Sequence, residues 1–507
     1  MDSPPFQGIN GNLFLTTPTL LKTLKINAPS YHKERERLLN KKTTPTLFDP
    51  NLREYQNQDV GFLLSLKNKA IFNQQRTGKT PTTLTTMKIN NENNALIICP
   101  SSILFKWNAE YNKWHQGPVE VIHNQMTIKK RREIINNFHG TIITSYGLVR
   151  NELNNFIKRK PHTIVIDEAH RLRNYKGARN RQSPQMAKAI IQLSRLAESR
   201  YALTGTPTPN KPENIYGILT FLFPHIFTSY WNFIEYYFHV KDTIIDNQMN
   251  TIKDIIGFKN KNKERELQEW LEIISIQRKR IEVMPWVNEI KYETIWIPPN
   301  QKQLKYLKEL NEFYEIEEEE LVTISILDRL IREQQIAIEP KMLDLNCKGV
   351  KTTWIQEYLQ DYPEKSIIFI SKFTSYLKYL KEHVIKDATL LIGETSEKQR
   401  YEIEQAFNDK KINTILANVD VAKEGMTLYG ADTMVFIDTS LTYTDNEQCM
   451  DRLLPVSEAI AKEKGIQEII LLMTKTPIEE YLYQMFKLKK SRTDILNNYK
   501  KYLMRRA

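Results

Sequence analysis

The chain has 507 residues, too many for one ordinary domain, and its hydrophobic content of 41% excludes a largely disordered chain. Its 72 basic and 60 acidic residues give a net charge of +12, which favours a polyanionic partner such as nucleic acid. Without an apolar run of 18 residues or an N-terminal signal pattern, we expect neither a membrane span nor secretion. The three cysteines and nine histidines predict no disulfide framework and no zinc site.

The first part of the chain alternates short apolar runs with amphipathic stretches of helical length. Residues 1–48 contain several prolines and a basic stretch, and we expect an N-terminal accessory segment there. Residues 49–225 follow as a first α/β lobe, because β-branched runs separated by helix-length segments predict parallel strands with crossover helices. The apolar runs are AIFN (70–73), ALIICP (95–100), GTIITS (140–145), HTIVIDE (162–168) and RYALTG (200–205).

The pattern changes between residues 226 and 345 and then returns. Long charged stretches predict a helical insertion or linker at 226–345, and the acidic run 315–320 predicts a solvated helix face. A second α/β lobe is predicted at 346–480, followed by a closing helix at 481–507. The apolar runs of this lobe are KSIIFIS (365–371), TLLIGE (389–394), NTILAN (413–418), TMVFID (433–438) and QEIILLM (467–473).

Residues 70–80, AIFNQQRTGKT, place Gly-Lys-Thr where a predicted strand meets a predicted helix. Gly78 would let the backbone approach phosphates, Lys79 would reach the β- and γ-phosphates of a nucleotide, and Thr80 would hold Mg²⁺. The pattern of such loops favours glycine at two positions that carry Asn73 and Arg76 here. We expect Asn73 to tolerate turn geometry and Arg76 to keep its backbone in the right-handed helical region.

Asp167 and Glu168 follow the predicted strand HTIVIDE and begin the tetrapeptide Asp-Glu-Ala-His. Asp167 would hold a metal through water and Glu168 would activate an attacking water. Taken alone, the pair is equally an acidic turn after a buried strand. Together with Lys79 it predicts a site for a nucleotide and Mg²⁺ at which water attacks a phosphate group.

The order of these blocks resembles the Swi/Snf-like DNA translocases of helicase superfamily two, as a DEAH-box-bearing member. LREYQNQDVGFL (52–63) resembles the adenine-reading segment, which implies Gln56 as the base contact. The resemblance covers about 50–490 and implies two RecA-like lobes with helical insertions and an ATP-driven motor on double-stranded DNA. Further blocks that carry it are LIICPSSILFKWNAEYNKW, ITSYGLVR, LTGTPTPNKPENIYGILTFLFP, SIIFISKFTSYL, GETSEKQRYEIEQAFN, ANVDVAKEGMTLYGADTMVFID and NEQCMDRLLP.

The resemblance also implies roles for residues of the second lobe and for DNA contacts. Gly425 would approach ATP and the DNA backbone, Gln448 would contribute to the nucleotide site, and Arg452 would act as the arginine finger. The family's final motif-six arginine is Pro455 here, so Arg452 acts alone, Lys462, Lys464 or a partner's arginine substitutes, or turnover is slow or lost. The phosphate contacts implied by motif position are Lys106, Thr144, Ser145, Thr206 and Lys372.

Several residues keep two interpretations at this stage. His170 and Thr204 would either relay the nucleotide state or form a structural hydrogen bond. Trp107 and Trp114 lie on one predicted helical face and favour core packing over base stacking. The cluster QRKR (277–280) is either a DNA-facing patch or a solvated helix.

Two other functions stay open. One is a helicase acting on branched DNA or RNA, and the other is a nucleotide-gated DNA- or protein-binding scaffold impaired by Pro455. The short insertion and the length favour a compact viral, phage or prokaryotic member. We therefore expect a cytoplasmic protein of a prokaryotic or virus-infected cell, or a nuclear one if the source is eukaryotic.

Overall fold

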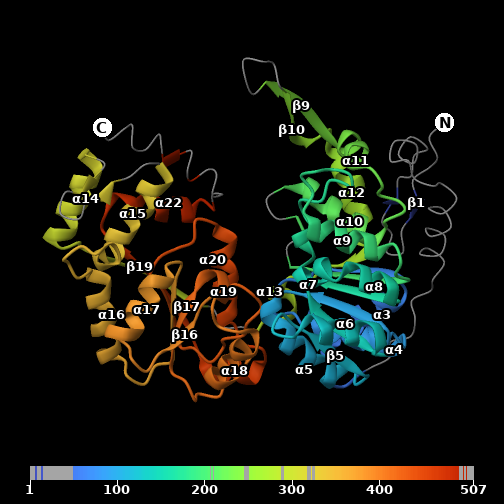
Figure 1. The fold of residues 1–507 in the computed structure, drawn as a ribbon, viewed down its shortest axis with the longest axis horizontal. Coiled ribbons are helices and arrows are strands. Elements are labelled where there is room, and N and C mark those ends of the chain that lie inside the picture. The colour runs from blue at the N-terminus through green and yellow to red at the C-terminus, as the bar shows by residue number, and fades with distance from the viewer. Residues whose placement is uncertain are drawn as a thin grey trace. The chain divides into compact units, whose positions relative to one another are not determined.

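The computed structural model describes residues 6–7, 13–14, 49–205, 207–208, 211–244, 251–286, 290–313, 315–316, 321–322, 326–489, 495 and 498–499. The chain divides into two compact units, Met1–Pro285 and Trp286–Ala507, which we call lobe 1 and lobe 2. Each unit contains one parallel sheet with helices packed around it (Figure 1). The predicted fold class, two α/β lobes with parallel sheets, is confirmed.

Lobe 1 contains a parallel sheet of seven strands in the order β11-β3-β8-β7-β4-β6-β5. All five apolar runs predicted for the first lobe contribute to this sheet. The sheet's edge beside β3 is completed by a strand that comes much later in the sequence. The strands are β3 (Asn68–Ile71), β4 (Ala95–Cys99), β5 (Val119–Ile122), β6 (Thr141–Ser145), β7 (Thr163–Asp167), β8 (Ser199–Leu203) and β11 (Ser275–Ile276).

Helices cover both faces of the lobe 1 sheet and form two apolar cores. Alternate residues of β7 enter different cores: Ile164 and Ile166 lie in one and Val165 in the other. This follows from the two-residue period of a strand, and burial on both faces explains the continuous apolar runs in the sequence. The helices are α3 (Glu54–Leu64), α4 (Lys79–Ile89), α5 (Leu104–Trp114), α6 (Ile128–Asn137), α7 (Tyr146–Asn151), α8 (Leu153–Arg159), α9 (Gln185–Ser194), α10 (Ile215–Leu222), α11 (Tyr230–Tyr237), α12 (Lys261–Ile274) and α13 (Arg280–Val283).

The segment predicted as a helical insertion is only partly helical. Between α11 and α12 the chain forms an antiparallel hairpin of β9 (Phe238–Ile244) and β10 (Thr251–Phe258), which projects from lobe 1 in Figure 1. The β-branched residues of TIKDIIGF favour a strand despite the charges between them. In the acidic run, Glu315–Ile316 forms the short strand β13 paired with β14 (Leu321–Val322), so the helix predicted at these two residues is wrong.

Lobe 2 contains a parallel sheet of six strands in the order β12-β19-β18-β15-β17-β16. Its strands are β12 (Lys291–Ile297), β15 (Ile367–Ser371), β16 (Thr389–Leu391), β17 (Thr414–Asn418), β18 (Thr433–Phe436) and β19 (Glu468–Thr474). Its helices are α14 (Gln301–Phe313), α15 (Ile326–Ile338), α16 (Val350–Asp361), α17 (Thr374–His383), α18 (Glu397–Asn408), α19 (Val419–Ala422), α20 (Tyr443–Met450), α21 (Glu458–Lys464) and α22 (Pro477–Lys487).

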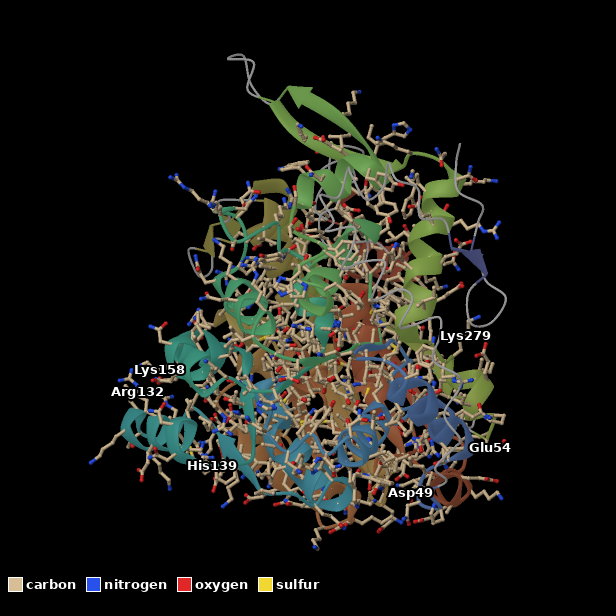
Figure 2. The ribbon with its side chains drawn as sticks, turned by 90° about the vertical axis from the view of Figure 1, so that its right-hand side faces the viewer. Asp49, Glu54, Arg132, His139, Lys158 and Lys279 are labelled. Carbon is tan, nitrogen blue, oxygen red and sulfur yellow. The ribbon has the colours of Figure 1, made fainter. Side chains whose placement is uncertain are left out.

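Charged side chains cover the outer helices of lobe 1. Figure 2 shows Arg132 of α6, Lys158 of α8 and the nearby His139 pointing outward on one side. Within the described part of the chain, no helix combines the length and apolar character needed to cross a membrane.

Candidate nucleotide-binding and DNA-binding residues

Gly78 sits at the turn from β3 to α4 in a conformation that only glycine adopts without strain. Its φ is +78°, and a Cβ at this position would lie 2.0 Å from Nε2 of Gln56. Gln56 is buried, donates from Nε2 to the carbonyl of Thr77 (3.3 Å) and accepts at Oε1 from the backbone N–H of Arg53 (2.9 Å). The Tyr55 hydroxyl donates to the same Thr77 carbonyl at 2.9 Å. The predicted adenine-reading residue is thus held against the loop between β3 and α4, residues 72–78, which we call the phosphate loop after its predicted role.

Lys79 and Thr80 begin helix α4, where backbone N–H groups and the helix dipole favour an anion. The ammonium of Lys79 donates to the carbonyls of Asn73 (3.0 Å) and Gln74 (3.3 Å), so it lies over the loop that precedes the helix. Thr80 is half-buried on the first turn. The phosphate-binding roles of Lys79 and Thr80 stay predictions.

The two departures from the glycine-rich pattern behave differently. Asn73 is buried, and its Nδ2 donates to Asp59 Oδ2 at 2.9 Å. Arg76 has a φ of +72°, so the expectation that its backbone stays in the right-handed region is wrong. A non-glycine residue in the left-handed region costs about 1–2 kcal/mol. Arg76 therefore adopts a backbone conformation that glycine would adopt without this cost.

Asp167 ends β7 at the same end of the sheet as the phosphate loop, because all strands are parallel. Burial, together with the charge of Glu168, raises the pKa of Asp167 to about 6. The indole N–H of Trp107, which donates to Asp167 Oδ2 at 2.9 Å, and the charge of Lys79 act in the opposite direction. The positive charge of Lys79 and the indole N–H of Trp107 thus favour the ionised form of this carboxylate.

Glu168 begins a chain of polar contacts that ends at the residue after β8. Its backbone adopts a φ of +56° and its N–H donates to Asp167 Oδ1 at 2.9 Å. Its carboxylate lies 3.2 Å from Nδ1 of His170, which lies 3.1 Å from the hydroxyl of the buried Thr204. The predicted His170–Thr204 contact is present. This geometry is compatible with both a relay and a structural hydrogen bond.

Trp107 is a functional candidate that the sequence did not identify. The ring is buried in the core between α5 and the sheet, as predicted, but its N–H reaches Asp167. Trp114, two turns further along α5, donates to Glu110 at 2.9 Å instead. No sequence pattern distinguishes the two tryptophans, because the contact depends on where α5 packs across the end of β7.

The lobe 1 donor set fits Mg²⁺ and a triphosphate. Carboxylate and hydroxyl oxygens from Asp167, Glu168 and Thr80 are hard ligands, and Lys79 supplies a positive charge for phosphates. Among the described residues, His, Cys, Asp and Glu side chains form no cluster of three or more suited to a metal.

The predicted DNA contacts of lobe 1 have different environments. Thr144 is fully buried in β6 and its hydroxyl donates to the carbonyl of Ile122 at 3.1 Å, so the structure does not support a phosphate contact there. Ser145 is buried and caps α7 through Leu148 N–H. Lys106 is half-exposed on α5. Thr206 lies outside the described residues.

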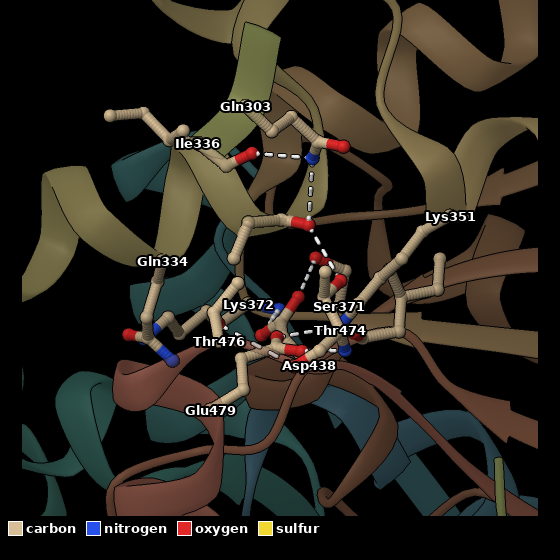
Figure 3. A network of polar contacts seen from close by, with 12 residues as sticks. Gln303, Gln334, Ile336, Lys351, Ser371, Lys372, Asp438, Thr474, Thr476 and Glu479 are labelled. Carbon is tan, nitrogen blue, oxygen red and sulfur yellow. Dashed lines mark hydrogen bonds and ion pairs between the residues drawn. The ribbon is translucent and has the colours of Figure 1, made fainter. Parts of the chain in front are cut away.

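In lobe 2, Lys372 follows β15 and belongs to a polar network drawn in Figure 3. Its Nζ donates to Gln334 of α15, and its backbone N–H donates to the buried Asp438 at 3.1 Å. Within the same network the buried Lys351 pairs with the buried Glu479 of α22 at 2.6 Å. The predicted DNA contact is thus held beside a buried ion pair that fixes two helices to the sheet.

The predicted nucleotide residues of lobe 2 lie on and around α20. Gly425 has a φ of +69°, which explains glycine there, and Gln448 is half-exposed. Arg452 is 6% exposed and its Nη2 donates to the carbonyl of Lys423. Pro455 is buried.

The two lysines considered as substitutes for the missing arginine also differ. Lys464 is mostly buried and occupied by Asp432 at 3.1 Å and by the carbonyl of Gly430, so it is not available as a substitute. Lys462 is exposed on α21 and pairs with Glu458 at 2.9 Å.

Comparison with known proteins places these residues in a family context. Residues 19–342 match the SNF2-related domain and residues 350–454 match the helicase conserved C-terminal domain. "Helicase domino" of Drosophila melanogaster is 27% identical over 226 residues, which are 42% of this chain and 7% of that protein. "Helicase swr-1" of Neurospora crassa is 30% identical over 193 residues, which are 36% of this chain and 10% of that protein.

A solved structure, "Sulfolobus solfataricus SWI2/SNF2 ATPase core in complex with dsDNA", is 22% identical and covers 90% of this chain and 95% of that chain, with a TM-score of 0.39. The chain spans a tenth or less of the length of the two curated relatives named above. The SNF2-related match alone covers more than half of the chain. The chain therefore belongs to the SNF2-related family of helicase superfamily two.

Proposed function

We propose that this protein is an ATP-driven motor that translocates on or remodels double-stranded DNA. The observation that carries the proposal is the position of Lys79 and Asp167 at the same end of the parallel lobe 1 sheet, Lys79 where β3 leads into α4 and Asp167 at the end of β7. Family membership links this site to helicase-type ATP hydrolysis. The basic surplus of the chain, +12, supports a phosphate-rich track.

Each lobe 1 residue has a distinct part in the proposed reaction. Lys79 holds the β- and γ-phosphates, while Thr80 and Asp167 hold Mg²⁺, which neutralises phosphate charge when bound. Glu168 accepts a proton from the attacking water, and the contact with His170 orients its carboxylate. Gln56 binds the adenine base. Gly78 allows the backbone to approach the phosphates.

We propose that lobe 2 supplies Arg452 to the transferring phosphoryl group, with Gly425 and Gln448 beside the nucleotide. Nη2 of Arg452 is hydrogen-bonded to the carbonyl of Lys423, and we propose that this contact changes when the guanidinium engages the phosphoryl group. ATP binding would favour this change, and hydrolysis would reverse it, so that a nucleotide cycle becomes a step along DNA. Lys106, Ser145, Thr206 and Lys372 remain the proposed phosphate-backbone contacts.

The finer classification is also a proposal. Asp-Glu-Ala-His at 167–170 supports a DEAH-type member, and the short segment 226–345 supports a compact, viral or prokaryotic type. The two curated relatives named above are eukaryotic. We propose work on DNA in the cytoplasm of a prokaryotic or infected cell, or in the nucleus of a eukaryotic one. The boundaries at 48, 225, 345 and 480 are proposed on the sequence pattern as boundaries of sequence blocks, since the block 226–345 contributes β11 to the lobe 1 sheet and β12 to the lobe 2 sheet.

A second candidate function is a nucleotide-gated scaffold that binds DNA or protein without efficient hydrolysis. It is favoured by the buried Pro455 and by Lys464, which is occupied within its own lobe. Because position 455 is a proline and Lys464 is bound within its own lobe, the arginine-finger role falls to Arg452, Lys462 or a partner.

The test is ATP hydrolysis measured with duplex DNA, single-stranded DNA, forked DNA and RNA, beside the variants Lys79→Ala and Glu168→Gln. Stimulation by duplex DNA that both substitutions abolish supports the motor. Stimulation only by forked DNA or RNA assigns a helicase acting on those substrates. ATP binding without hydrolysis on any nucleic acid, unaffected by Glu168→Gln, assigns the scaffold.

A further inference from the structure

The first part of the loop between β3 and α4, residues 72–74, is bound by a segment more than 200 positions later in the chain. Strand β11 pairs with β3, and the pairing continues past the end of the strand. The N–H of Phe72 donates to the carbonyl of Ile276 (2.8 Å), and the N–H of Gln74 donates to the carbonyl of Arg278 (3.0 Å). The N–H of Arg280 then donates to Oε1 of Gln74 at 2.7 Å. Residues 72–74 are thus fixed on one side by residues 276–280.

A buried carboxylate connects the same two segments through side chains. Asp59 of α3 is 0% exposed and accepts from Arg278 through Nε (2.9 Å) and Nη2 (2.7 Å). It also accepts from Nδ2 of Asn73 at 2.9 Å. Asn73 stands where the usual loop pattern has a glycine, and its side chain makes this contact with Asp59. A carboxylate this buried is stabilised only by such partners.

These contacts change the interpretation of the basic cluster at 277–280, which the sequence left as a DNA-facing patch or a solvated helix. Arg278 is 31% exposed, but one edge of its guanidinium, Nε and Nη2, donates to Oδ1 of the buried Asp59, so this arginine has a structural partner inside lobe 1. Lys279 points outward, as Figure 2 shows. The cluster is followed by the short helix α13 and then by Pro285, where lobe 1 ends.

We propose that Asp59, Asn73 and Arg278 form a latch that positions the phosphate loop for the nucleotide. The proposal rests on the proposed function of that loop in ATP binding. Lys79 donates to the carbonyls of Asn73 and Gln74, which are the residues the latch holds. A shift of these carbonyls therefore moves the lysine relative to the phosphates. Asp59 and Arg278 are positioning residues, since they act through the loop rather than on the substrate.

The test compares Arg278→Gln and Arg278→Lys with a control pair of the same kind in the same lobe. Glu152 is 4% exposed and accepts from Nε of Arg132 (3.1 Å) and from Nδ2 of Asn155 (2.8 Å). Arg132 and Lys279 lie on opposite sides of the view in Figure 2, so Arg132→Gln removes a comparable contact away from the loop. The full-length variants are assayed for binding of a fluorescent ATP analogue, for KM and kcat, and for thermal unfolding without nucleotide.

We expect Arg278→Gln to raise the Kd and KM for ATP by about 10- to 100-fold, a range typical of a small misplacement of a binding group. The kcat at saturating ATP should fall less than KM rises. Arg278→Lys should give an intermediate Kd, because it keeps the charge and loses the fork. Arg132→Gln should lower the unfolding temperature without changing the Kd.

A Kd within twofold of the wild-type value in Arg278→Gln would overturn the latch, while loss of binding in Lys79→Ala would leave the proposed function standing. Equal losses of affinity in Arg278→Gln and Arg132→Gln would also overturn it, since they would show a general loss of stability. If the unaltered protein binds no ATP analogue, the proposed function itself fails and the latch with it. Asp59→Asn, which keeps the size of the side chain, provides the second variant if Arg278→Gln does not fold.

Discussion

The hydrogen bond from Trp107 to Asp167 gives the sharpest test of the lobe 1 site. Trp107→Phe removes the indole N–H and keeps most of the apolar ring that packs between α5 and the sheet. A hydrogen bond to a charged group contributes about 1.5–3 kcal/mol. Since 1.4 kcal/mol is about tenfold in an equilibrium constant, the Mg²⁺ concentration for half-maximal nucleotide binding should rise about 10- to 100-fold.

The assay titrates Mg²⁺ against binding of a fluorescent ATP analogue and, separately, against DNA-stimulated hydrolysis. Trp114→Phe is the matched control, because Trp114 lies on the same helix and donates to Glu110. Binding measured without Mg²⁺ should not change in either variant. Equal Mg²⁺ dependence of the two variants, with both folded by thermal unfolding, would refute the view that Trp107 positions the metal-holding carboxylate.

Four further outcomes are expected. Glu479→Gln leaves the buried Lys351 without its charge partner and should lower the free energy of unfolding of lobe 2 by about 3–5 kcal/mol in denaturant titrations. The double variant Lys351→Met/Glu479→Leu should recover much of this loss, and a loss under about 1 kcal/mol in Glu479→Gln contradicts the prediction. Arg76→Gly should stabilise lobe 1 by about 1 kcal/mol, since glycine adopts the φ of +72° freely, and a lower unfolding temperature would count against it. The pKa of Asp167 is raised to about 6, so this carboxylate is mostly protonated below that pH. The affinity of the protein–ATP complex for Mg²⁺ should therefore fall as pH drops from about 7.5 to about 5.5, by more than the affinity of free ATP does, and a flat profile argues against Asp167 as the metal-holding residue. Arg452→Ala should reduce kcat by about 10³-fold or more while ATP affinity changes little, and unchanged turnover would exclude Arg452 as the finger.

The α/β lobes could be predicted because their strands are buried on both faces. Runs such as HTIVIDE are continuously apolar only when helices cover both sides of the sheet, and β7 shows this directly. The hairpin of β9 and β10 was missed because Lys241, Asp242 and Lys253 resemble the charges of a solvated helix. The sequence pattern gives the identity of such residues but not the partner strand that makes a charged segment extended.

The candidate site was predictable to the extent that it is local. Gly78, Lys79 and Thr80 lie at a strand-to-helix turn, where their neighbours along the chain define their geometry. The contacts of Trp107 and Arg278 bring together segments far apart in sequence, so they depend on packing that no short motif encodes. Thr144 illustrates the opposite error, because its motif position suggested exposure and its strand lies inside the sheet.

The placement of β11 has a practical consequence for anyone who wishes to shorten this protein. A fragment that stops at residue 225 would lack Ser275–Ile276 and would leave one side of β3 without its neighbour. The N–H groups of Phe72 and Gln74 would lose their acceptors, and an open sheet border of this kind invites aggregation. A fragment intended to bind nucleotide should therefore extend to Pro285, so that β11 can pair with β3.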